Sequence, residues 1–212
     1  MDQGASVRTM RNLRMKVALL IGASLLLLTG CAKMDAAAII GDVEIPLATV
    51  QTSIDDVIRE RGEVDTTGME FPTEEQLVQS QAQFHITLVI LEELGKQFGI
   101  EISKTDIDAE RESIISQVGG EDQLARALAG AVIAQADFEK YIIASKTYQR
   151  IGEILVGQGI ATEEVPNAQQ ALIVKKAKEL SVTVNPRYGV WDAATASLQS
   201  GGDSNGAVDD QK

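Results

Sequence analysis

Apolar residues recur along most of this chain at the three- and four-residue spacing of an α-helix. The longest such pattern begins at Thr73, where the sequence Thr-Glu-Glu-Gln forms a capping box, and it continues to about Phe98. Its apolar positions form a stripe broad enough to need cover on most sides: Leu77, Phe84, Ile86, Leu88, Ile90, Leu91, Leu94 and Phe98. The pattern predicts that this helix is the central element of the fold.

Five shorter helices are predicted, one before the central helix and four after it. The first begins at Pro46, which has no backbone N–H to lose at that position, and ends at Gly62. Apolar periodicity and glycine breaks predict the others at residues 103–118, 121–129, 138–156 and 168–180. Turn-rich linkers are expected at residues 62–72 and 157–167.

Short extended segments flank this helical region. Residues 36–40 and 43–45 enclose a Gly-Asp turn and predict a strand pair, and residues 182–184 predict a third strand. The chain is expected to continue as a loop from Asn185, and the Ser-, Gly- and Asp-rich residues 193–212 predict a disordered tail. The expected fold is therefore mostly α, with a strand pair or three-strand element joining the N- and C-terminal parts of residues 36–192.

The N-terminal segment has the organisation of an export signal. Basic residues precede an apolar run at residues 17–28, which is shorter than the ~20 residues that a membrane-spanning helix needs. The run leads into Leu-Thr-Gly-Cys at positions 28–31, which resembles the lipobox of bacterial lipoprotein signals. The resemblance implies removal of residues 1–30 by cleavage between Gly30 and Cys31, and diacylglyceryl and N-acyl lipid on Cys31. The alternative is a structural cysteine after a short membrane helix.

The net charge and the counts of cysteine and histidine argue against several classes of ligand. The net charge of −12 argues against a basic face for nucleic acid or anionic lipid, so the lipid on Cys31 would supply the membrane contact through a tether at residues 31–35. One cysteine and one histidine exclude the usual zinc ligand sets, and no metal or other cofactor is expected. The chain should then lie on the outer face of a bacterial cytoplasmic membrane.

Catalytic chemistry is not predicted anywhere in the chain. His85 lies in the central helix, where a packed structural histidine is the favoured interpretation over a proton switch. The sequence indicates no histidine partner for Ser53, Ser80 or Ser113, and none of them lies in a Gly-x-Ser-x-Gly turn. Adjacent acidic residues such as Glu92-Glu93 point about 100° apart on a helix and favour solvated faces. The chain is expected not to be an enzyme.

The order of elements resembles the N-terminal domain of SurA/PrsA-type extracytoplasmic chaperones and the trigger-factor C-terminal domain. The similarity rests on Phe-Gly-Ile-Glu-Ile-Ser at 98–103, on Ala-Asp-Phe-Glu-Lys-Tyr at 136–141, and on residues 177–192, which look like the closing helix and strand of actinobacterial SurA-like lipoproteins. Many members insert a parvulin domain with paired histidines, where this chain has only residues 157–167. The departure argues against prolyl isomerase activity.

The resemblance implies a chaperone-like lipoprotein that holds unfolded or nascent secreted polypeptides. Such chaperones expose apolar surface to their clients, and burial of a client's apolar segment would provide the binding free energy. The candidate client-binding residues are Met69, Phe71, Leu88, Leu91, Phe138 and Tyr141. The alternative function is a cell-envelope scaffold or accessory lipoprotein that binds one specific protein partner through the same surface.

Overall fold

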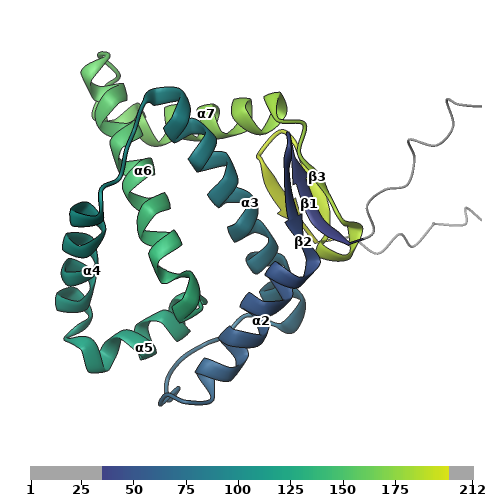
Figure 1. The fold of residues 1–212 in the computed structure, drawn as a ribbon, viewed down its shortest axis with the longest axis vertical. Helices are drawn as coiled ribbons and strands as arrows, with labels where there is room; N and C mark the ends of the chain where they lie inside the picture. Colours follow the sequence, from purple (N-terminus) through teal and green to yellow (C-terminus); the bar gives the residue numbers. More distant parts are fainter. Residues whose placement is uncertain (1–34, 201–212) are drawn as a thin grey trace, which may run out of the picture. The chain divides into compact units, whose positions relative to one another are not determined.

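The computed structural model describes residues 35–200 of the chain (Figure 1). The expected signal segment, with Gly30 and Cys31, lies outside the described residues, as do residues 201–212. The described part is mostly helical with small antiparallel sheets, which confirms the expected fold class. In residues 35–200, no helix is both long enough and apolar enough to cross a membrane.

The central helix of the prediction is α3, Glu74–Phe98, the longest element described. The Thr73 hydroxyl accepts a hydrogen bond from the backbone N–H of Gln76, whose side chain accepts one from the N–H of Thr73, so the capping box is formed. Gly99 ends the helix in the left-handed conformation that glycine adopts without strain. Helices α2, α6 and α7 and strand β1 all contact α3, which gives it the predicted cover.

The other helices follow the predicted order with small shifts at their ends. They are α2 (Leu47–Arg61), α4 (Lys104–Val118), α5 (Glu121–Ala131), α6 (Phe138–Gly157) and α7 (Val165–Glu179). A single 3₁₀ turn precedes α6, namely η1 (Gln135–Asp137), and another precedes α7, namely η2 (Thr162–Glu164). Figure 1 shows the sheet on one side of α3, with α4, α5 and α6 on the other.

The N- and C-terminal parts meet in a three-stranded sheet. Strand β1 (Ala36–Ile40) lies between β2 (Val43–Pro46) and β3 (Thr183–Val184), and both pairings are antiparallel. Asn185 extends the junction, because its side-chain amide donates a hydrogen bond to the carbonyl of Ala36. The predicted joining of the two ends by a three-strand element is therefore confirmed.

Residues 193–200 differ from the prediction of a disordered tail. Strands β4 (Val190–Asp192) and β5 (Ser197–Gln199) form an antiparallel hairpin after the 3₁₀ turn η3 (Pro186–Tyr188). Leu198 is buried, and its backbone N–H donates to the side-chain oxygen of Gln83 on α3. The prediction was wrong here because three-residue strands carry little periodicity, and this hairpin is held by a contact with a distant helix.

The buried apolar side chains form two separate cores. The main core joins the three-stranded sheet, α2, α3, α7 and the C-terminal half of α6. A second, smaller core lies where α4 and α5 meet the start of α6, and its buried members are Leu124, Leu128, Phe138 and Ile142. We call α4, α5, η1 and the first half of α6 the arm: the three helices supply the second core, and η1 lies between α5 and α6 in the chain.

Candidate functional site

An apolar groove of about 480 Å³ lies between α3 and α6. Its walls come from α3, from the link after α3 and from α6, and they include Leu88, Ile100, Ile102, Ile143 and Ala144. Glu92, Lys96 and Lys140 also line the groove and have half or more of their side chains exposed, so the charged groups face solvent beside an apolar interior.

Helices α3 and α6 meet at two contacts near this groove. At one contact, the backbone of α3 approaches α6 closely at Gly95, where a Cβ atom would lie 3.3 Å from the Cγ2 atom of Thr147. At the other, His85 of α3 lies near Asp137 at the start of α6. About ten residues of each helix lie between these contacts, a length of about 15 Å at 1.5 Å per residue. The groove lining starts between these contacts, at Leu88 and Lys140, and continues past Gly95 to Ile100 and Ile102 in the link after α3.

A buried polar cluster forms the second of these contact points. The hydroxyl of Ser53, on α2, donates to Oδ2 of Asp137 at 2.6 Å and lies 2.8 Å from Nε2 of His85. All three side chains are about 5% exposed or less. Lys140 donates to the other carboxylate oxygen of Asp137 at 2.8 Å, and Lys140 also lines the groove. The cluster thus joins α2, α3 and α6 and ends at the groove wall.

The charges in this cluster follow from its burial. Burial lowers the pKa of His85, an effect that the Asp137 carboxylate opposes and Lys140 reinforces. Burial by itself would raise the pKa of Asp137, but hydrogen bonds from Lys140 and Ser53 outweigh it and hold that pKa below its ordinary value. At neutral pH the cluster therefore contains a neutral imidazole and an ionised carboxylate.

The same residue types form the catalytic triad of serine hydrolases, but their order here is different. In a triad the histidine lies between the serine and the carboxylate and takes the serine proton. Here the serine lies between the other two groups, donates its proton to the carboxylate and is only 4% exposed. This arrangement supports a structural connection between helices and gives no accessible nucleophile.

Sequence analysis missed this cluster because Ser53 lies 32 positions from His85 and 84 from Asp137. One signal was present in the sequence. Ser53 interrupts the apolar stripe of α2 beside Ile54, and His85 interrupts that of α3 beside Ile86. Polar residues at buried helix positions require partners, so two such interruptions on neighbouring helices point to a shared contact.

Four of the six predicted client-binding residues lie on α3 and α6. Leu88 lines the groove, and Tyr141 is 38% exposed. Leu91 and Phe138 are only 5% and 2% exposed, since Leu91 packs in the main core and Phe138 in the second core. Their assignment to a client-binding surface was wrong, because helical periodicity does not indicate which apolar face of a helix is covered.

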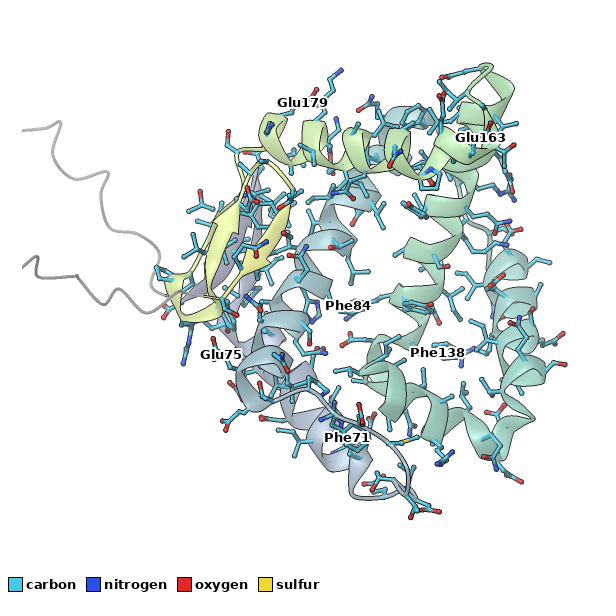
Figure 2. The ribbon with its side chains drawn as sticks, turned by 180° about the vertical axis from the view of Figure 1, so that it is seen from behind. Phe71, Glu75, Phe84, Phe138, Glu163 and Glu179 are labelled. Carbon is cyan, nitrogen blue, oxygen red and sulfur yellow. The ribbon has the colours of Figure 1, made fainter. Side chains whose placement is uncertain are left out.

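The other two predicted residues, Met69 and Phe71, lie in the loop between α2 and α3. Phe71 is partly buried beside the end of α2 (Figure 2). The Arg61 guanidinium lies 4.3 Å from the centroid of its ring. Burial lowers the pKa of Arg61, and its Nε and Nη2 atoms have no hydrogen-bond partner, so the ring is its main contact. Met69 packs close to Gly130 of α5. Both residues therefore connect the loop to the rest of the fold and lie away from the groove.

Neither a metal-ligand group nor a known relative adds to the description of this site. Within residues 35–200, no three His, Cys, Asp or Glu side chains gather in a group that could hold a metal ion. The SurA/PrsA-type resemblance stays a prediction that rests on the sequence motifs. No protein-family model matches the chain, and no curated protein or solved structure matches it either.

Proposed function

We propose that the chain is a membrane-anchored chaperone-like lipoprotein that holds unfolded secreted polypeptides in the groove between α3 and α6. The observation that carries the proposal is the groove itself, an open apolar site of about 480 Å³ with exposed Ile143 and Tyr141 on the helix that forms one wall. The proposal includes lipid on Cys31, a location on the outer face of the bacterial cytoplasmic membrane, and no prolyl isomerase activity.

The dimensions of the groove suit a short extended segment. The part of α3 that lines the groove, Leu88 to Lys96, is about 12 Å long at ~1.5 Å per residue, which accommodates about four extended residues at ~3.3 Å each. Alternate side chains of such a segment point the same way. About two apolar side chains would then enter the groove, each contributing about 1.5–3 kcal/mol before the costs of association are subtracted. The expected affinity is weak, which suits a protein that must release its client.

The charged groups beside the groove favour selection by apolar content. Lys96 is paired with Glu92 and Glu93, and Lys140 is paired with Asp137. Because each ammonium group already has a carboxylate partner, the groove offers little net charge to a client. The full sequence has a net charge of −12, and removal of residues 1–30, with four basic residues and one acidic residue, makes it −15. This charge would keep a complex with an unfolded apolar chain soluble.

The client-binding part of the proposal is tested by filling the groove. Ala144→Phe places a ring among the groove walls, whereas Ala171→Phe adds the same ring at an exposed position of α7 outside the groove. The purified domain should suppress aggregation of a denatured client and bind a fluorescent leucine-rich peptide. We expect Ala144→Phe to remove both activities and Ala171→Phe to retain them. Equal suppression by the two variants, or none by the parent domain, would contradict the proposal.

The anchoring part is tested independently. A bacterial host expressing the full chain with metabolic fatty-acid labelling should incorporate label and place the protein in the membrane fraction. Cys31→Ser should lose the label and retain the uncleaved segment. If Cys31→Ser is labelled and processed like the parent chain, the lipid assignment is wrong.

A further inference from the structure

We propose that the Ser53–His85–Asp137 cluster is a proton-operated latch that holds the arm closed and thereby controls the groove between α3 and α6. The inference concerns regulation of the groove and rests on the proposed function for its biological meaning. The physical basis of the latch does not depend on the proposed function, because the contacts of the cluster are formed within the domain itself, without a client.

The cluster is well placed to control the position of α6. Asp137 is the last residue of η1, directly before α6, and it is tied to α2 through Ser53. A second contact lies two residues earlier, where the backbone N–H of Gln135 donates to Oε2 of Glu60 on α2. Between the start of α6 and its close approach at Thr147 lies the groove wall, so release of the start would change the spacing of the walls.

The hydrogen bonds require a proton on Nε2 of His85. Ser53 has one proton, and its shortest bond directs that proton to Asp137, so the serine oxygen must accept from Nε2–H of His85. Protonation adds a charge to a ring that is only 5% exposed. The facing groups are the uncharged Ser53 from α2, the Asp137 carboxylate from η1 and the Lys140 ammonium from α6, and the edge of Phe84 lies next to the ring on α3 itself.

The direction of the effect follows from the balance of these groups. Burial and Lys140 disfavour the imidazolium more than Asp137 favours it, so the closed latch lowers the pKa of His85. In the released latch the pKa returns to the ordinary ~6.5. The latch therefore holds fully above about pH 6.5 and weakens as the pH falls below that value, by at most about tenfold between pH 7.5 and 5.5.

His85 is the only histidine in the chain, which permits a direct test. Its ring protons give a single NMR titration curve, and we expect a midpoint below ~6.5. Native-state hydrogen exchange should show the opening: after correction for intrinsic rates, protection of the amides in η1 and the first turns of α6 should fall by up to about tenfold from pH 7.5 to 5.5. Amides of β1, which lie outside the arm, are the internal control.

The matched variant is His85→Gln, whose side-chain amide can still donate to Ser53 but does not titrate. It should retain protection in η1 and α6 and lose the pH dependence. Binding of the leucine-rich peptide should weaken toward pH 5.5 in the parent domain to the extent that the open state becomes a substantial fraction, and it should stay constant in the variant. A His85 midpoint at or above ~6.5, or the same pH dependence of exchange in both proteins, would overturn the latch.

The two proposals fail in different ways. If the peptide binds at neutral pH but exchange in η1 and α6 does not respond to pH, the latch is wrong and the chaperone proposal stands. If exchange responds as expected but no peptide binds at any pH, the chaperone proposal is wrong and the latch stands. Should His85→Gln fold poorly, the NMR titration and the exchange measurements on the parent domain still decide the inference.

Discussion

The second core predicts that the arm can unfold without the rest of the domain. Ile142 has no exposed surface and packs with Leu124, Leu128 and Phe138. Ile142→Ala removes three carbon atoms worth ~0.8 kcal/mol each and leaves a cavity, for a total of about 3 kcal/mol. With so few buried members, the second core has little other apolar burial to compensate for that loss.

The expected result is a local change in native-state hydrogen exchange. A loss of about 3 kcal/mol corresponds to a decrease in protection of about a hundredfold, and it should be confined to amides of α4, α5 and the start of α6. Amides of α2 and the sheet should keep their protection. The matched control is Ile90→Ala, because Ile90 is equally buried but belongs to the main core on α3. It should lower protection throughout the domain.

The reasoning is refuted if Ile142→Ala lowers protection in α2 and the sheet as much as in α4. That result would mean that the two cores unfold as one cooperative unit, despite their separation in the folded state. A single global unfolding unit would also remove the basis for a moving arm.

Two further predictions concern the hairpin and the acid stability of the domain. Gly189 has φ +117°, and a Cβ atom there would overlap the carbonyl oxygen of Gln199, so Gly189→Ala should cost at least about 1–3 kcal/mol. Denaturant unfolding followed by Trp191, the only tryptophan, would show no loss if this argument is wrong. Asp137→Asn should cost about 1–3 kcal/mol at neutral pH. Because the pKa of Asp137 is lowered, the carboxylate stabilises the fold above its unfolded pKa of ~3.9, and the difference from the variant should shrink below about pH 4; a constant difference would contradict the assignment.

Local signals in the sequence predicted the helices well. Thr73 and Ser103 each form a capping box, and Gly99 and Gly119 end helices in the left-handed conformation, as the pattern of polar and glycine residues indicates. These signals act within one turn of the helix, so they can be read without the tertiary fold. Strand β3 was also predicted, because a short β-branched run follows the last helix.

Tertiary contacts determined the features that were not predicted. The hairpin at residues 190–199 depends on Gln83, more than a hundred positions away in the sequence. The groove was only partly predicted, through Leu88, because its remaining walls come from α6, from the link after α3 and from the close approach of the two helices at Gly95. Which apolar face stays uncovered depends on how the helices cross, and periodicity carries no information about that.

The pairing of β1 with β3 has a consequence for the order in which the chain acquires its structure. Ala36 and Asn185 are 149 positions apart, yet their hydrogen bond closes the sheet that covers one side of α3. Contacts of such sequence separation form late, because nearly the whole chain must be ordered before they are made. During synthesis, β1 therefore has no β3 partner until residues 183–185 have been made. The growing chain itself passes through the unfolded, apolar-exposing state that it is proposed to hold in others.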